Sequence, residues 1–364
     1  MTTEVPRARR RGNGEHRRPA LVLACVFGAS ALRCSLIDTD GLAGGGAGAP
    51  DASSEERSSS EAATPDASVA EEAGTAEVVA SGQTGAFGLA RLGATLYWTS
   101  ANSGNDVSSC PLDHCVQPSV VASGAKATVI VAATRVYWIT PGKPSVSFTV
   151  DGAPNGELAL SAPGVWLATG ANAVFASQSN GQVVRLQGDP PFSTTTFLGF
   201  DPNPDRLSAN GAALAWTASS GGRDNVGYCG SGGCDASTSV VAQNEGPVAV
   251  ALDASFLFWT TADGRIRSAA HDGKSITSSA RDVATGFAEP AALAPDEASP
   301  FLYFVARGTP ARSYLDGMVG KVAKSGGAVT VLASDQARPA SVLVTETHVY
   351  WANEYDGTIR RALK

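Results

Sequence analysis

Short apolar stretches that carry one large aromatic side chain recur along the chain from residue 78 onward. The clearest unit is 347–361, THVYWANEYDGTIRR, in which an apolar stretch, a polar turn and a mixed stretch follow one another. Apolar residues at successive positions predict a strand that is covered on both faces. The Asp-Gly pair between the stretches predicts a tight hairpin, because glycine accepts the positive φ of such turns. The unit therefore predicts short antiparallel strands.

The aromatic stretch occurs seven times. Its Trp or Phe positions are separated by 40, 37, 41, 43, 45 and 47 residues. A period near 40 residues, built from four short strands, is typical of β-propeller blades. Burying one large side chain per unit stabilises the fold by about 2–3 kcal/mol, so we interpret these aromatics as packing between blades. The seven stretches are 96–99, 136–139, 173–176, 214–217, 257–260, 302–305 and 349–352.

Two further elements keep the same period. An apolar strand opens the repeat at 78–81, 120–123, 240–242 and 331–334, and the last unit stops after its third strand. We therefore expect 78–81 to complete the final blade and to close the ring, which removes exposed sheet edges. The predicted fold is all-β, a seven-bladed β-propeller spanning 78–364.

Asn-Gly or Asp-Gly pairs precede the third strand of four units, and each is followed by x-Val or x-Ile. We predict a hairpin with a positive φ at the glycine of each pair. The pairs are Asn180-Gly181, Asp263-Gly264, Asp316-Gly317 and Asp356-Gly357.

The N-terminal segment differs in composition from the repeat. Six arginines between positions 7 and 18 precede 14 mostly apolar residues at 19–32. A basic head with a short apolar run is typical of a secretory signal peptide, and a membrane-spanning helix needs about 20 apolar residues. Residues 34–77 hold ten acidic residues, one base and almost no large apolar side chain. We predict a signal peptide at 1–33 and a disordered acidic linker at 34–77.

Three ways of processing the predicted signal peptide remain possible. Cleavage after Ala31 fits an ordinary signal, while lipidation of Cys25 or Cys34 fits a lipoprotein. Cleavage before Cys34, with that cysteine lipidated, leaves four other cysteines that can pair completely. We favour Cys34 as the anchor, although Arg33 departs from the small residue that the motif requires. The predicted location is the cell envelope: lipid-anchored, or periplasmic or extracellular.

The four remaining cysteines form two pairs with C-x4-C spacing, Cys110 with Cys115 and Cys229 with Cys234. Both pairs follow the third strand of their units, which are three steps apart on a ring of seven. Such a separation excludes a zinc site shared by the two pairs and a cross-pair disulfide. We predict two local disulfides that close outer hairpins.

The aromatic strands followed by Asp-Gly-x-Ile resemble the YWTD and NHL classes of propeller repeat across essentially all of 78–364. The chain departs from that pattern where it lacks the Asp after Trp-Thr, with Ser100, Ala218 and Thr261 in its place. The resemblance implies a propeller that mostly serves as a binding platform, with lyases and esterases as a minority. Propeller lyases of the streptogramin-inactivating type need a histidine on the central face, and the four histidines of this chain do not fall there.

Propeller geometry indicates where a site would lie. Loops that enter the first strand of each blade, and loops after its second strand, gather at one end of the channel. Mixed acids and arginines there are suited to a protein or carbohydrate partner. The candidates are Asp201, Asp205, Arg206, Arg223, Asp224, Glu245, Glu289, Arg307, Arg338 and Glu354.

Charge and motifs narrow the function classes. Residues 78–364 hold 19 Lys and Arg against 22 Asp and Glu, so no basic field attracts a phosphate backbone and we expect no nucleic-acid partner. No phosphate-binding loop, hydrolase motif or metal motif occurs, and we expect no cofactor and no bound metal. We predict a monomeric, non-catalytic binding scaffold. The alternative is a channel-centred lyase or Ca²⁺-dependent lactonase or esterase.

Overall fold

The structure is a computed structural model, and it describes residues 70–71, 76–101, 106–150, 152–170, 173–188, 192–198, 204–218, 224–231, 234 and 240–364. The predicted signal peptide, Cys25, Ala31 and Cys34 lie outside the described residues. Residues Ala63–Lys364 form one compact unit. Within the described ranges, no helix combines the length and the apolar character that crossing a membrane requires.

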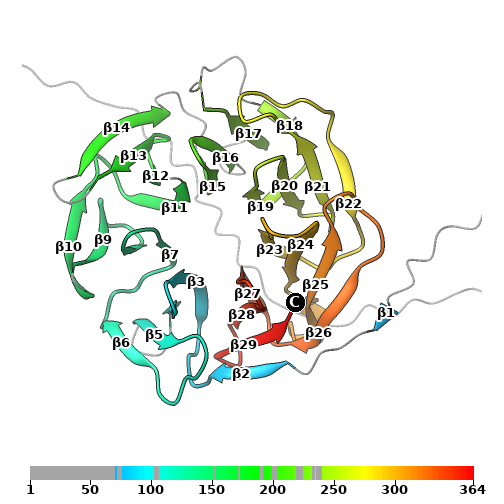
Figure 1. The fold of residues 1–364 in the computed structure, drawn as a ribbon, viewed down its shortest axis with the longest axis horizontal. Helices are drawn as coiled ribbons and strands as arrows, with labels where there is room; N and C mark the ends of the chain where they lie inside the picture. The colour runs from blue at the N-terminus through cyan, green and yellow to red at the C-terminus, as the bar shows by residue number, and fades with distance from the viewer. Residues whose placement is uncertain are drawn as a thin grey trace, which may run out of the picture. The chain divides into compact units, whose positions relative to one another are not determined.

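Seven small antiparallel sheets, numbered here as blades 1 to 7 in chain order, stand around a common centre (Figure 1). The arrangement confirms the predicted seven-bladed propeller. Blade 1 is built from β3 (Ala86–Leu92), β4 (Thr95–Ser100), β5 (Val107–Pro111) and β6 (Ser119–Ala122), and blade 2 from β7 (Val129–Ala132), β8 (Val136–Ile139), β9 (Ser145–Val150) and β10 (Ala153–Ala159). Blade 3 is built from β11 (Gly164–Gly170), β12 (Ala173–Gln178), β13 (Val183–Gln187) and β14 (Ser193–Leu198), and blade 4 from β15 (Arg206–Asn210), β16 (Ala213–Ala218), β17 (Asn225–Cys229) and β18 (Val240–Gln243).

Blades 5 to 7 continue the same order, with the first strand of each blade innermost. The described residues contain a single helical element, the 3-10 turn η1 (Pro310–Arg312), in blade 6. Blade 5 is built from β19 (Pro247–Leu252), β20 (Phe256–Thr261), β21 (Ile266–Ala270) and β22 (Arg281–Ala284). Blade 6 is built from β23 (Pro290–Pro295), β24 (Phe301–Ala306), β25 (Gly317–Ala323) and β26 (Thr330–Gln336), with β1 (Ala70–Glu71) beside β26. Blade 7 is built from β27 (Pro339–Val344), β28 (His348–Asn353), β29 (Thr358–Leu363) and β2 (Glu77–Ala80).

The ring is closed by a strand from the other end of the chain. β2 pairs antiparallel with β29, with Glu77 opposite Arg361 and Val78 opposite Arg360. This pairing confirms the predicted closure and supplies the fourth strand of blade 7. β1, which falls within the predicted linker, adds two residues in parallel to the outer edge of blade 6.

The core lies between the blades. Trp98, Trp259 and Trp351 are fully buried in the second strands of blades 1, 5 and 7. Trp98 belongs to a cluster that includes Tyr350 of blade 7, and Trp351 to a cluster that includes Tyr303 of blade 6. These contacts confirm that the repeated aromatics pack one blade against the preceding one.

Three of the indoles also hold the loop that enters their own blade. Trp98 Nε1 donates to Gln83 Oε1 at 2.9 Å, and Trp351 Nε1 donates to Gln336 Oε1 at 2.9 Å. Blade 5 uses a carboxylate at the corresponding place, where Trp259 Nε1 donates to Glu245 Oε2 at 2.9 Å. A buried tryptophan therefore fixes the backbone just before the innermost strand in three of the blades.

Three of the four predicted glycine turns are confirmed. Gly181, Gly264 and Gly357 have positive φ values of 85°, 87° and 63°. The prediction for Gly317 is wrong, because Gly317 begins β25 and its φ is not positive. A Cβ at Gly317 would lie 2.4 Å from Pro339 Cδ, so this glycine allows close packing between blades 6 and 7 and does not form the turn.

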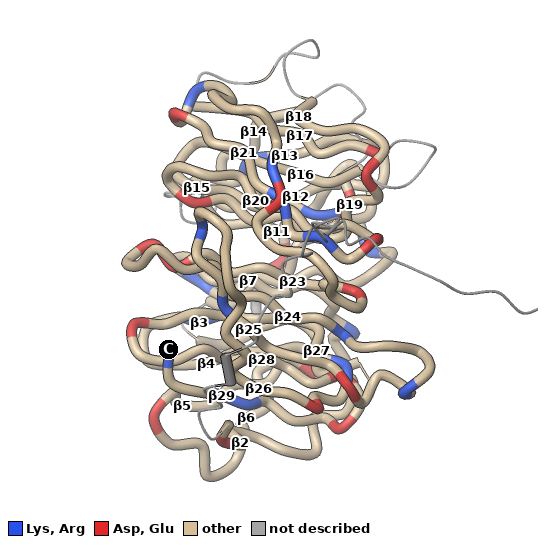
Figure 2. The backbone as a smooth tube through the Cα atoms, turned by 90° about the vertical axis from the view of Figure 1, so that its right-hand side faces the viewer, with Lys and Arg blue, Asp and Glu red and all other residues tan. Residues whose placement is uncertain are grey.

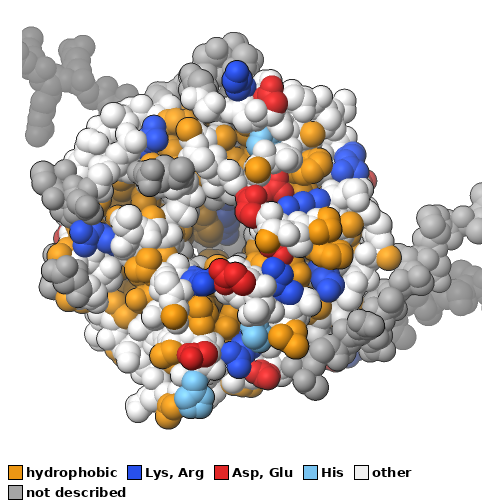
Figure 3. Space-filling model, viewed as in Figure 1, with side chains coloured by type: hydrophobic (Ala, Val, Ile, Leu, Met, Phe, Trp, Pro, Cys, Tyr) orange, Lys and Arg blue, Asp and Glu red, His pale blue; other side chains and the backbone are white. Residues whose placement is uncertain are grey.

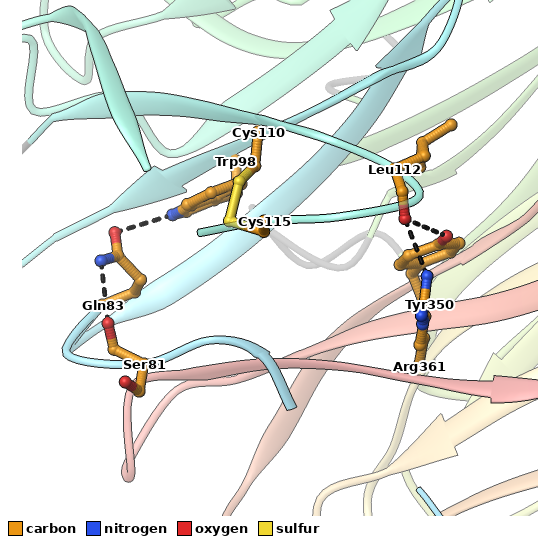
Figure 4. The surroundings of a disulfide bond; sticks show 8 residues. All are labelled: Ser81, Gln83, Trp98, Cys110, Leu112, Cys115, Tyr350 and Arg361. Carbon is orange, nitrogen blue, oxygen red and sulfur yellow. Dashed lines mark hydrogen bonds between the residues drawn. A yellow bond between two sulfur atoms is a disulfide. The ribbon is translucent and has the colours of Figure 1, made fainter. Parts of the chain in front are cut away.

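Both predicted cysteine pairs are joined by disulfides, with Cα atoms 5.5 Å and 5.2 Å apart, as disulfide geometry requires. The hairpin closed by Cys110 and Cys115 reaches blade 7 (Figure 4), where Leu112 O accepts hydrogen bonds from Tyr350 Oη at 3.1 Å and Arg361 Nη1 at 2.9 Å. The first disulfide thus shapes a contact at the junction of the first and last blades.

The two faces of the ring carry different loops, and many of the charged residues lie in these loops (Figure 2). The entry face contains the loops that enter each first strand and the loops between second and third strands. The return face contains the turns between first and second strands and the loops between third and fourth strands. The predicted binding candidates belong to the entry face.

Candidate functional site

The first strands of the seven blades enclose a central channel with a cavity of about 460 Å³, visible as the hollow in the middle of the ring (Figure 3). Most of its wall consists of small or aliphatic side chains. The charged side chains in the described wall are Arg206, Arg307 and Glu297. Glu297 lies toward the return face, where its Oε1 accepts a hydrogen bond from Asn210 Nδ2 at 2.7 Å.

Arg206 is the first residue of β15 and lies at the entry-face end of the channel. Its guanidinium carbon lies 3.9 Å from the centre of the Trp166 ring, a cation–π contact. The side chain makes no hydrogen bond or ion pair with any described residue. Burial, and then the charge of Arg307, lower the pKa of Arg206 to about 10, against the opposing effect of Asp205.

Arg307 follows β24 of blade 6 and lines the same cavity. Its Nε is buried without a hydrogen-bond partner among the described residues. Burial, and then the charge of Arg338, lower the pKa of Arg307, and Glu354 and Glu289 oppose the shift. Two arginines on different blades therefore face one cavity, and no carboxylate of the described residues is bound to either.

Five side chains of blades 6 and 7 form a cluster at the rim beside Arg307, called here the rim cluster: Glu289, Tyr314, Arg338, Glu354 and Tyr355. Tyr314 Oη donates to Glu289 Oε1 at 3.1 Å, and Arg338 Nη1 pairs with Glu354 Oε1 at 3.1 Å. The Arg338 guanidinium lies 5.0 Å from the ring centres of both tyrosines. The hydrogen bond to Glu289 is the main cause of a raised Tyr314 pKa.

The backbone of the rim cluster is unusual. Glu289, Tyr314 and Arg338 have φ values of 53°, 58° and 56°, a region that non-glycine residues rarely occupy. Glu289 and Arg338 each precede the proline that begins an innermost strand, and blade 5 has Gly246, with φ 58°, at the corresponding position. Blades 6 and 7 thus carry charged side chains where the backbone favours glycine.

Other predicted candidates have internal partners. Asp224 Oδ1 accepts the Gly246 N–H at 2.7 Å, which fixes the loop entering blade 5. Glu245 accepts from Trp259 and pairs with Arg267, and both members of that pair are largely buried. Asp205 is half-buried and also has interaction partners. Asp201 and Arg223 lie outside the described residues.

The structure therefore brings together Arg206, Glu289, Arg307, Arg338 and Glu354 of the predicted set. Two aromatic residues were missed as site residues: Trp166, on an innermost strand, and Tyr355, which is 46% exposed in a hairpin turn. The sequence signal for Trp166 was present, because it is a large aromatic outside the repeated second-strand position. Tyr355 lies in the polar turn of the last repeat and carried no separate signal.

The return face has a different arrangement of charge. Lys324 Nζ pairs with Asp253 Oδ2 of blade 5 at 2.8 Å and donates to Asp296 O at 2.7 Å. Lys364 repeats the pattern one blade later, pairing with Asp296 Oδ2 and donating to Thr345 O at 3.1 Å. Burial acts to raise the pKa of Asp296, but hydrogen bonds from Lys364 and Ser299 outweigh it, so the pKa lies below its usual value.

His271 occupies the equivalent place in blade 5. Its Nε2–H donates to Asp253 O at 3.0 Å, and its Nδ1 accepts from Gly273 N at 3.1 Å and lies 3.1 Å from Tyr228 Oη of blade 4. His271 is buried, although it lies in a polar hairpin turn. His271, Lys324, Lys364 and their acceptors form a continuous ladder across blades 4 to 7, called here the inter-blade ladder.

A catalytic interpretation needs convergent carboxylates or a histidine with a carboxylate at the channel. Among the described residues, no histidine lines the cavity. The same residues contain no group of three or more His, Cys, Asp or Glu side chains placed to hold a metal ion.

Comparison with known proteins places the chain by fold. No family model and no curated protein sequence matches it. It is similar to virginiamycin B lyase from Staphylococcus aureus, at 15% identity and a TM-score of 0.62 over 79% of this chain and 98% of that one. Hydrazine synthase of Kuenenia stuttgartiensis is similar at 11% identity and a TM-score of 0.60, over 77% and 96% of the two chains. At these identities the likeness shows a shared propeller fold and nothing of activity.

Proposed function

We propose that this protein is an exported, membrane-tethered propeller that acts as a non-catalytic binding scaffold and engages a protein or carbohydrate partner through its entry face. The basic, apolar N-terminal segment and Cys34 support the export and the tether. The acidic segment 34–77 would act as the spacer between the anchor and the propeller.

One observation carries the binding role. The rim cluster places three non-glycine residues, Glu289, Tyr314 and Arg338, in left-handed backbone conformations around one opening. Each such residue destabilises the fold by about 1 kcal/mol or more. Strain of this kind persists where the side chain has a use that glycine cannot serve, and it gathers at ligand-binding sites.

The chemistry of the rim cluster agrees with a partner surface. Tyrosine and arginine are enriched at binding hot spots because they combine a large apolar area with hydrogen-bond donors. Tyr355 is 46% exposed, and Arg338 lies between the two tyrosine rings. A partner that covers this cluster would bury aromatic surface and surround the Arg338–Glu354 pair.

The binding test uses the full chain immobilised and exposed to solubilised envelope extract and to purified envelope polysaccharide. Arg338→Gly combined with Tyr355→Ser should abolish saturable capture, because it removes the rim side chains while glycine suits the backbone at position 338. Arg91→Ser, on the return face, is the matched control and should capture normally. Capture that survives the rim variant and is lost in the control would refute the proposal.

The tether is tested separately by Cys34→Ser, followed by fractionation of membranes. The wild-type chain should sediment with membranes, and the variant should be released into the soluble exported fraction. An unchanged distribution would contradict the assignment of Cys34 as the anchor.

A further inference from the structure

Two arginines at the entry-face end of the channel have no direct carboxylate partner among the residues that the structure describes. Arg206 makes no hydrogen bond or ion pair with a described residue, and the buried Arg307 Nε has no described acceptor. Buried cations are normally paired, because removing a charge from water without a partner is costly. The lysines of the inter-blade ladder follow that rule, and these two arginines do not.

The orientation of Arg206 leaves its donors available. Its guanidinium lies over the Trp166 ring at 3.9 Å. Stacking uses the face of the guanidinium, whereas its N–H donors point outward in the plane of the group. A planar acceptor with two oxygens can therefore meet the edge of Arg206 in a bidentate pair.

Neutral polar groups line the same cavity. The hydroxyl of Ser341, on the innermost strand of blade 7, is buried and has no hydrogen-bond partner among the described residues. Thr128 and Ser208 also line the wall. The free Ser341 hydroxyl, in the same cavity as two arginines without a described carboxylate partner, matches a ligand that carries both hydroxyl groups and an acidic group.

We propose that the entry-face end of the channel binds the carboxylate of a sugar acid, with Arg206 and Arg307 as the carboxylate clamp and Ser341 as a hydroxyl partner. This inference rests on the proposed binding function and specifies the carbohydrate. The cavity of about 460 Å³ falls within the usual range of small-ligand sites, roughly 300–1,000 Å³, and accommodates one or two sugar rings.

The electrostatics support the same ligand. Burial, and then the charge of Arg307, lower the pKa of Arg206. Burial, and then the charge of Arg338, lower the pKa of Arg307. A carboxylate between them would offset both effects, because an opposite charge nearby favours the charged form. The arginines remain protonated at neutral pH, so binding should be constant between pH 6 and 8.

The test is calorimetric titration of the full chain with D-glucuronate and with D-glucose, two probes of nearly equal size that differ in the carboxylate. Glucuronate should bind saturably and glucose at least tenfold more weakly. Arg206→Met and Arg307→Met should each reduce the glucuronate affinity tenfold or more, since each removes a charged hydrogen bond. Arg206→Lys should recover only part of it, because lysine lacks the planar fork.

Arg91→Met, the matched control at an arginine outside the channel, should leave the glucuronate affinity within twofold. Equal affinity for glucose and glucuronate, or full affinity in both channel variants, would overturn the clamp. Sulfate that binds as tightly as glucuronate would overturn the assignment to a carboxylate. Acetyl-dialanine that binds when glucuronate does not would overturn the assignment to a sugar.

The clamp and the proposed scaffold function can fail separately. A flat glucuronate titration with normal capture by the rim cluster removes the clamp and leaves the scaffold. Loss of rim-dependent capture while glucuronate still binds at Arg206 and Arg307 removes the scaffold and leaves a small-molecule site.

Discussion

The two faces of the propeller use buried charge in opposite ways. On the return face, Asp253 and Asp296 each pair with a lysine from the following blade. On the entry face, Arg206 and Arg307 line a cavity without a hydrogen-bonded acid among the described residues. Charge on the return face is neutralised within the chain and joins the blades, whereas we propose that the two channel arginines of the entry face are available to a ligand.

The difference shows how a repeated scaffold separates stability from binding. Every blade supplies the same loops to each face, yet the inter-blade ladder and both disulfide hairpins belong to the return face. The entry face holds the strained residues and the two channel arginines that have no described carboxylate partner. Substitutions on the two faces should therefore have effects of different size and, in one case, of different sign.

The largest effect is expected from Lys324→Met. The variant leaves the Asp253 side chain, only 3% exposed, without its cation, and breaking a buried pair from one side costs about 3 kcal/mol. Urea unfolding should report this loss in the free energy of unfolding. Arg91→Met, which breaks a pair whose Glu346 side chain is 75% exposed, should change it by less than about 0.5 kcal/mol. Equal values for the two variants would remove the structural role of the ladder.

The second effect concerns the disulfide hairpin. Cys110→Ser with Cys115→Ser should lower the free energy of unfolding by about 2 kcal/mol, because the bond restricts the unfolded chain. Hydrogen exchange should also show earlier opening of the β2–β29 pair, since Leu112 of this hairpin contacts Tyr350 and Arg361 of blade 7. Unchanged exchange at β29 would show that the hairpin does not support ring closure.

The third effect has the opposite sign. Arg206→Met should raise the free energy of unfolding at pH 7 by about 1 kcal/mol. It removes a partly buried charge that has no described carboxylate partner, and this gain exceeds the loss of the cation–π contact. The folded pKa of about 10 lies below the unfolded value of 12.5. Between these pH values the unfolded wild-type chain therefore binds more protons than the folded one. As pH rises through 10, the free energy of unfolding of the wild type rises relative to that of the variant. Urea unfolding at pH 7 and pH 10.5 measures this; a less stable variant at pH 7 would contradict it.

The smallest effect is expected at the rim cluster. Arg338→Gly loses the pair with Glu354 and the tyrosine contacts but relieves a φ of 56°. These changes nearly cancel, and we expect a net change within about 0.5 kcal/mol. Thermal unfolding would measure it. Gly246→Ala, the reverse exchange at the equivalent position of blade 5, should cost about 1 kcal/mol, because its φ is 58° and the new Cβ would lie 3.1 Å from Ala262 Cβ. A loss above 1.5 kcal/mol for Arg338→Gly would make the rim cluster structural.

The sequence predicted those features that depend on local pattern and period. Trp98, Trp259 and Trp351 marked the second strands because burial on both faces requires successive apolar residues. Closure by 78–81 followed from counting the strands, and the disulfides followed from spacing. These predictions needed no knowledge of which blades touch.

The candidate site could be predicted only in outline, because its composition depends on contacts between loops. Sequence placed Glu245 and Arg338 equally on the entry face, but the Trp259 indole and Arg267 hold the first and the tyrosines surround the second. The prediction of a turn at Gly317 was wrong because the close packing of Gly317 against Pro339 joins two blades and has no local sequence signal. The contact of His271 with Tyr228 has no local sequence signal, because the two residues lie 43 positions apart.

The pairing of β2 with β29 joins residues separated by 284 positions. During synthesis, 77–80 emerge early and have no sheet to join until 358–363 are present. Contacts of such long range are slow to form, so the seventh blade must be the last to gain its full set of strands. Until β2 pairs with β29, the outer edge of blade 7 lacks its fourth strand.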